Sequence, residues 1–157
     1  MFKRYSIALF LIFVLNIYAN AYMVSFFVLE TGVDDSIAYS EHSVNWESAF
    51  MDVFFDAGFI VSNAPSIRMR TRPDDIVHAA SYEFDDALRG GVDYFFIVQL
   101  DYTQGEILPG NVTIYLYKII PFAKITERTM AARRYVSSRD EFDDYKSILR
   151  GFIPLIN

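Results

Sequence analysis

A nearly unbroken run of apolar residues, VDYFFIVQL at 92–100, stands near the middle of this chain. Gly90 and Gly91 precede the run, and the charged Asp101 follows it. A short apolar run that is rich in aromatic and β-branched side chains and bounded by turn residues is typical of a strand buried on both faces. The pattern therefore predicts a central strand here, with other parts of the chain covering both of its sides.

Four further segments have the pattern of strands. Residues 23–29 (MVSFFVL) form a compact apolar run, and residues 59–61 (FIV) form a shorter one. Residues 111–120 (NVTIYLYKII) alternate between two faces, and a turn at 121–123 lets residues 124–136 return beside them. Two strands joined by so short a turn pair antiparallel. The pattern thus predicts a closing hairpin at the edge of the sheet.

Three stretches carry apolar residues at intervals of three and four, which is typical of amphipathic helices. They are 43–57, 74–89 and 138–152. The predicted order is β-α-β-α-β-β-β-α, which indicates an α/β protein with a single mixed β-sheet of about five strands and helices packed on the sheet. Strand–helix–strand crossovers favour parallel pairing, so the early strands should be parallel and the hairpin antiparallel.

The N-terminus has the three parts of a secretory signal peptide. Lys3 and Arg4 supply the positive charge, residues 7–17 (IALFLIFVLNI) supply the apolar core, and Ala19-Asn20-Ala21 supplies the small residues of a cleavage site. We therefore predict a cleaved signal at 1–21 and a single α/β domain at 22–157. The protein is then exported, to the periplasm or beyond the cell.

An uncleaved membrane anchor is the alternative to a signal peptide. Residues 5–29 carry no charge and are long enough to span a bilayer. Asn16 and Asn20 interrupt this run, and its second half is required as the first strand of the domain. An anchor would tether the same domain to the inner membrane without changing its chemistry.

Charge and cysteine content exclude several classes of function. The 157-residue chain has a net charge of −6, which becomes −8 when Lys3 and Arg4 are removed with the signal. An acidic protein has no general attraction to nucleic acid or to an anionic membrane surface, so we expect no nucleic-acid partner and no membrane insertion of the mature chain. The absence of cysteine excludes disulfides, thiolate metal sites and a cysteine nucleophile.

Three arginines form the first candidate contact surface. Arg68, Arg70 and Arg72 alternate with other residues, so in an extended segment they project from one face. Such a stripe of guanidinium groups can bind phosphate, carboxylate or an acidic protein surface. The alternative is an edge strand that its charges protect from aggregation.

The second candidate surface is aromatic. Tyr115 and Tyr117 share one face of the predicted hairpin, and Phe122 lies in its turn. Exposed aromatic and arginine side chains are those that most often anchor protein interfaces. We therefore predict partner binding through Tyr115, Tyr117 and Phe122, through the arginines, or through both.

Metal binding and catalysis find little support in the sequence. Glu30, Asp34 and Asp35 fall in a polar segment predicted as a loop at 30–40, where they either ligate a cation or form a solvated acidic loop, and their spacing lacks the pattern of a calcium loop. His42 and His78 are isolated from each other and from any cysteine, which argues against a zinc site. We identify no catalytic constellation and expect no cofactor and no metal.

The order of elements resembles the small envelope domain of the TolB N-terminal, CsgG and penicillin-binding-protein activator lipoprotein type. The features that carry the resemblance are MVSFFVL at 23–29, DAGFIV at 56–61 and GVDYFFIV at 91–98. The resemblance implies a protein that binds other envelope proteins or assembles, without catalysis. This chain lacks the lipidation cysteine of such lipoproteins.

Two functions of different classes follow from these observations. The first is an exported, non-enzymatic envelope protein that binds or assembles with a protein partner. The alternative is a small exported hydrolase, for which Asp93 and Asp101 at the two ends of the central strand are the carboxylates to test. No Gly-x-Ser-x-Gly motif is present to supply a serine nucleophile.

Overall fold

The computed structural model describes residues 21–33, 40–103 and 106–156. It contains one mixed sheet with the strand order β2-β1-β4-β5-β6, in which the short β3 also pairs with β1. The elements are β1 (Met23–Thr31), α2 (Glu41–Asp56), β2 (Ile60–Asn63), β3 (Ile67–Met69), α3 (Ile76–Ala79), α4 (Ser81–Arg89), β4 (Tyr94–Tyr102), β5 (Pro109–Lys118), β6 (Ala123–Ala131), α5 (Ser138–Arg150) and the 3-10 turn η1 (Ile153–Leu155). The predicted α/β class is confirmed.

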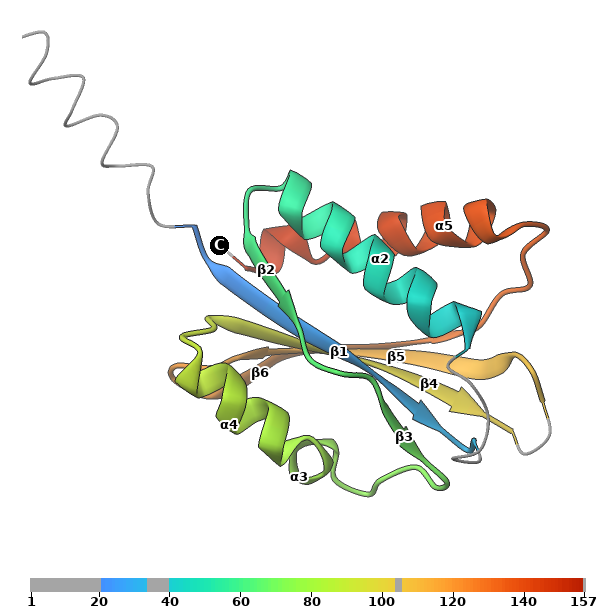
Figure 1. Cartoon of the computed structure of the whole chain (residues 1–157), viewed down its shortest axis with the longest axis horizontal. Helices are drawn as coiled ribbons and strands as arrows, with labels where there is room; N and C mark the ends of the chain where they lie inside the picture. The colour runs from blue at the N-terminus through green and yellow to red at the C-terminus, as the bar shows by residue number, and fades with distance from the viewer. Residues whose placement is uncertain (1–20, 34–39, 104–105, 157) are drawn as a thin grey trace, which may run out of the picture.

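Helices cover the sheet on both sides, so the molecule has three layers (Figure 1). Helices α2 and α5 pack together on one face, where the even-numbered core residues of β4, such as Phe96 and Val98, point. Helices α3 and α4 lie on the opposite face, where Phe95 and Ile97 point. The alternation of side chains along a strand thus divides the apolar run between two hydrophobic cores.

The prediction of a central strand at 92–100 is confirmed. Strand β4 lies between β1, to which it is parallel, and β5, to which it is antiparallel. From Tyr94 to Leu100 every residue is buried. The parallel crossovers at β1 and the antiparallel β5–β6 hairpin also agree with the prediction.

Several local boundaries differ from the sequence prediction. The return strand predicted at 124–136 ends at Ala131, as β6. Strand β1 continues through Glu30 to Thr31, because both residues extend the pairing with β4. Residues 67–69 form an additional short strand. The helix predicted at 74–89 divides into α3 and α4 at Ala80, which leaves helical geometry with φ −102° and ψ 18° while its side chain is buried.

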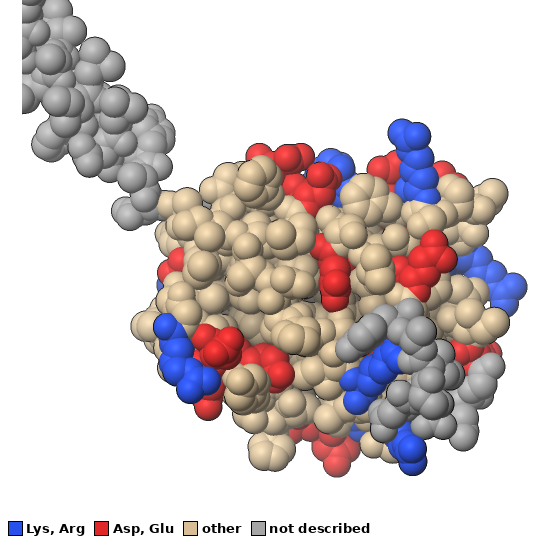
Figure 2. All heavy atoms as spheres, in the orientation of Figure 1, with Lys and Arg blue, Asp and Glu red and all other residues tan. Residues whose placement is uncertain are grey.

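Of the signal peptide predicted at 1–21, residues 1–20 lie outside the described part of the chain. Among the described residues, no helix combines the length and apolar character that crossing a membrane requires. The acidic side chains are dispersed over the face shown in Figure 2, with uncharged surface between them. The negative charge of the protein therefore does not gather into one patch on this face.

Candidate functional site

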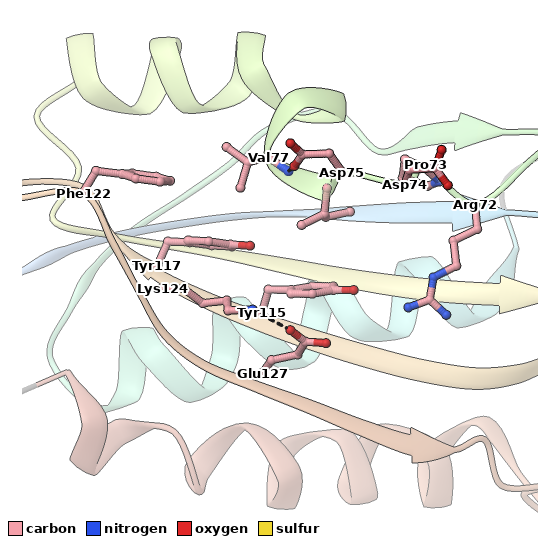
Figure 3. Close-up of a pocket in the computed structure, with 11 residues that line it drawn as sticks. Arg72, Pro73, Asp74, Asp75, Val77, Tyr115, Tyr117, Phe122, Lys124 and Glu127 are labelled. Carbon is pink, nitrogen blue, oxygen red and sulfur yellow. Dashed lines mark hydrogen bonds and ion pairs between the residues drawn. The ribbon is translucent and has the colours of Figure 1, made fainter.

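The six predicted contact residues line two hollows that share Arg72. The first, which we call the α3 cleft, has a volume of about 600 Å³ and lies between α3 and the β5–β6 hairpin (Figure 3). The second, the strand-end groove, has a volume of about 1120 Å³ and lies at the carboxyl ends of β1, β3 and β4. Tyr115, Tyr117 and Phe122 line the cleft, and Arg68 and Arg70 line the groove.

All three predicted arginines line the strand-end groove, but Arg68 and Arg72 bond acids on opposite faces of the sheet, so the three do not project from one face of a strand. Arg68 lies in β3 opposite Glu30 of β1, and its Nε is 2.8 Å from a carboxylate oxygen of Glu30. Strand β3 ends at Met69, and the chain then turns towards α3. Arg72 consequently reaches the other face of the sheet, where its guanidinium donates to Asp101 at 3.2 Å. The alternation rule fails because the extended segment is only three residues long.

Glu30 is a buried structural carboxylate and not a loop residue. It is 1% exposed and accepts hydrogen bonds from the backbone N–H and hydroxyl of Ser40, at 3.2 and 2.5 Å, and from the Ser43 hydroxyl. Ser40 is the N-cap of α2 and Ser43 lies in its first turn, and the N-terminus of a helix favours negative charge. Together with Arg68, the carboxylate joins β1, β3 and α2. The other two acids predicted as cation ligands, Asp34 and Asp35, lie outside the described residues.

Gly32 directly follows β1, and a glycine is required there because the chain passes close to the end of β4. Its φ is +81°, and a Cβ built there would lie 2.0 Å from the carbonyl oxygen of Tyr102. Gly58 has a similar φ of +86° but has open space around it. A comparison of alanine substitutions at the two glycines therefore separates the cost of a positive φ from the cost of a steric clash.

We expect Gly32→Ala to lower the free energy of unfolding by about 3 kcal/mol, and Gly58→Ala by about 1 kcal/mol. The smaller loss is that of an alanine held in a left-handed conformation. The larger loss, at Gly32, also includes the cost of displacing the β4 backbone at Tyr102. Urea denaturation of both variants measures the difference. Equal losses would contradict the close approach of Gly32 to Tyr102.

A chain of polar groups crosses the sheet beneath the α3 cleft. Asp101 accepts from the side chains of Thr31 and Gln99, the latter at 2.7 Å, and Gln99 in turn accepts from the Tyr115 hydroxyl at 3.0 Å. Burial raises the pKa of Tyr115. The network fixes Arg72 and Tyr115 at the border of the two hollows. In the sequence, Gln99 is the one polar residue inside the apolar run FFIVQL, and this is the signal that points to the network.

The aromatic residues of the hairpin form the floor of the cleft. The prediction that all three are exposed is wrong for Tyr115 and Tyr117, which are 6% and 2% exposed, because α3 and α4 cover this face; Phe122 is 54% exposed. The ring planes are nearly parallel, with angles of 17° between Tyr115 and Tyr117 and 11° between Tyr117 and Phe122. In Figure 3 the two hydroxyls point the same way along the cleft.

Charged side chains surround this floor. Lys124 pairs with Glu127 at 2.8 Å, and Arg72 pairs with Asp101. Asp75 caps α3 by accepting from the backbone N–H of Val77 at 2.9 Å and of His78 at 3.2 Å. Asp74 lies beside it at the mouth of the cleft. Sequence reasoning missed Asp74, Asp75 and Glu127 as lining residues, since nothing local places them opposite the hairpin.

The two carboxylates considered for hydrolysis lie far apart. Asp93 precedes β4 and accepts from the backbone N–H of Met23 at 2.8 Å, whereas Asp101 lies near the other end of the strand. Eight residue steps along the strand separate them by roughly 26 Å. Both carboxylates hold the sheet together and they do not face a common substrate position.

In the described ranges no three His, Cys, Asp or Glu side chains are placed to share a metal ion. His42 lies within hydrogen-bonding distance of Glu141, which also accepts from Tyr145 and from Asn45 at 2.8 Å. This buried cluster joins α2 to α5. His78 is exposed, as predicted.

No protein-family model and no curated protein matches this chain. Among solved structures, the PelC dodecamer from Paraburkholderia phytofirmans is similar with a TM-score of 0.46 and 14% identity, over 86% of this chain and 87% of that one. A point variant of the same dodecamer gives 0.45 and 14%, over 88% and 91%. A competence or damage-inducible protein from Enterobacter asburiae gives 0.41 and 10%, over 85% and 87%.

Similarity at this level concerns the course of the chain and carries no argument about function. The resemblance to the TolB, CsgG and penicillin-binding-protein activator domains stays a prediction.

Proposed function

We propose that this protein is an exported, non-enzymatic protein of the cell envelope that binds a protein partner through the α3 cleft. The observation that carries the proposal is the convergence of Arg72, Tyr115, Tyr117 and Phe122 on one hollow. These residues come from two separate parts of the chain. Arginine and aromatic side chains gathered in a concave surface are the usual anchors of a protein interface.

The placement of the acidic groups also supports a binding role. Glu30, Asp93 and Asp101 are engaged in bonds that hold the sheet and α2 together. A catalytic carboxylate needs access to a substrate and a partner group at a suitable distance. The export signal predicted at 1–21 assigns the interaction to the envelope or the exterior.

Self-assembly is a second form of the same proposal, favoured by the edge of the sheet. Strand β6 is the last strand in the order and pairs only with β5 in the described part of the chain. Exposed apolar side chains, Ile120, Phe122 and Ile125, lie in the turn before β6 and at its start. An open edge with such residues beside it is able to pair with a second chain.

Photo-crosslinking in intact cells tests the proposal. A photoreactive phenylalanine analogue at Phe122 should capture one defined protein or a second copy of this chain. The same analogue at Phe55, which is 72% exposed on α2, serves as the control. The captured protein, once purified, should bind the Phe122→Ala variant at least tenfold more weakly and the Phe55→Ala variant with unchanged affinity. Equal capture at both positions, or equal affinity of both variants, would refute a partner site in the cleft.

A further inference from the structure

The predicted cleavage site lies directly against the sheet. The bond to be cut joins Ala21 to Tyr22, and β1 begins at the next residue, Met23. Strand β1 then runs through the middle of the sheet, between β2 and β4 (Figure 1). A single residue, Tyr22, therefore separates the predicted cut from the first strand of the domain.

Both residues after the cut are bound in the folded domain. The carbonyl oxygen of Tyr22 accepts from the backbone N–H of Ile60 at 3.1 Å, and the Tyr22 ring packs edge-on against Tyr94 with centroids 5.6 Å apart. On the other side, the N–H of Met23 donates to the Asp93 side chain at 2.8 Å, and its carbonyl accepts from the Asp93 N–H at 2.9 Å. The backbone that follows the predicted cut thus lies between β2 and the start of β4.

Proteolysis of this bond requires backbone that can leave the fold. A peptidase holds its substrate as an extended strand through backbone hydrogen bonds. Ala21 is exposed and meets this requirement, but the backbone groups of Tyr22 and Met23 are already used by the sheet. Cutting the folded protein therefore needs prior opening of the start of β1, and its rate falls with the population of the opened form.

We propose that signal cleavage and folding compete for Tyr22 and Met23, so that the signal peptidase acts efficiently only before β1 joins the sheet. In the cut, water adds across the Ala21–Tyr22 peptide bond and gives a carboxylate on Ala21 and an amino group on Tyr22. A chain that is cut first becomes the mature domain, whereas a chain that folds first keeps residues 1–21. This inference rests on the export signal of the proposed function and adds the order of the two steps.

The fold also shortens the segment that is able to act as an anchor. Of the uncharged residues 5–29, Met23 to Leu29 belong to β1, and all of these except Met23 are buried there. Residues 5–22 remain, which is close to the shortest length that spans a bilayer. The order of cleavage and folding thereby decides between the cleaved and the tethered form of the protein.

Purified full-length precursor, folded in detergent micelles and treated with signal peptidase, tests the inference. The matched substrate carries Gly-Ser-Gly-Ser between Ala21 and Tyr22, which keeps the Ala-Asn-Ala sequence and moves the cut away from the sheet. The folded protein with the insertion should be cut at least about tenfold faster than the natural one. Synthetic peptides of residues 12–30, with and without the insertion, measure the enzyme's own preference, and the ratio for the proteins is divided by the ratio for the peptides.

A side-chain variant tests the role of the contacts at Met23. Asp93→Ala removes the acceptor of the Met23 N–H and should raise the cleavage rate of the folded precursor about threefold or more. Asp143→Ala, which removes an exposed acid on α5, is the control and should leave the rate unchanged. Equal rates for the two variants would contradict protection by the start of β1.

The outcomes for the two proposals are separable. Equal corrected rates for the natural protein and the protein with the insertion would overturn the inference and leave the export signal in place. A protein with the insertion that is not cut at all would overturn both the inference and the predicted signal. Capture at Phe122 tests the partner site of the proposed function independently of either result.

Discussion

Replacing Glu30 by alanine is expected to lower the free energy of unfolding by about 3–5 kcal/mol. The carboxylate is 1% exposed and is the common acceptor for Ser40, Ser43 and Arg68. Its removal takes away the charge opposite Arg68 and leaves the two serine hydroxyls at the start of α2 without their acceptor. Urea denaturation of the mature domain measures the loss.

Two further variants define the origin of this loss. Glu30→Gln keeps an oxygen for the serines and removes the charge, so it should fall between the wild type and Glu30→Ala. Asp143→Ala removes an exposed carboxylate and should change the stability by less than about 0.5 kcal/mol. If Glu30→Ala costs no more than Asp143→Ala, the buried ion pair does not hold β3 and α2 to the sheet.

Truncation of Phe96 to alanine should cost about 3–5 kcal/mol, because it leaves a cavity in the larger of the two cores. Phe96 is fully buried in the central strand, and its ring lies 5.0 Å from that of Phe50, 5.1 Å from Phe54 and 5.7 Å from Phe152, centre to centre. It therefore joins β4 to α2 and to the segment after α5. The midpoint of urea denaturation should fall with little change in the slope.

Phe55→Ala is the matched control, since Phe55 belongs to the same helix as Phe50 and Phe54 but is 72% exposed. Its loss should stay within about 0.5 kcal/mol. A loss below about 1 kcal/mol for Phe96→Ala would mean that this side chain is not buried between the sheet and helices α2 and α5, and the three-layer architecture would be wrong.

The layout of the elements was predictable because it depends on patterns within short segments. The apolar run at 92–100 indicated burial on both faces, and the alternation in 111–120 assigned Val112 and Ile114 to one core and Tyr115 to the other. The periodicity of the helices was likewise local. Boundaries were less accurate where pairing with a distant strand decided them, as for Glu30 and Thr31 of β1.

The candidate site was predictable in its residue types but not in its geometry. Arg72, Tyr115, Tyr117 and Phe122 were selected as two separate surfaces, and they proved to line one cleft. These residues come together because the segment after β3 brings Arg72 to the face of the sheet that carries Tyr115 and Tyr117. No local sequence pattern predicts that path. The exposure expected of Tyr115 and Tyr117 failed for the same reason, since α3 and α4 come from a part of the chain about thirty residues away.

The amino-acid sequence by itself determined the mixed sheet, the strand at its centre, the closing hairpin and the helical segments, because hydrophobic periodicity is written within each segment. Only the tertiary structure decided that Arg68 faces Glu30, that Arg72 faces Asp101 and that the Tyr117 hydroxyl points into a cleft beneath α3. Those contacts join residues far apart in the chain, and their positions follow from strand order and from how the two helical layers close over the sheet.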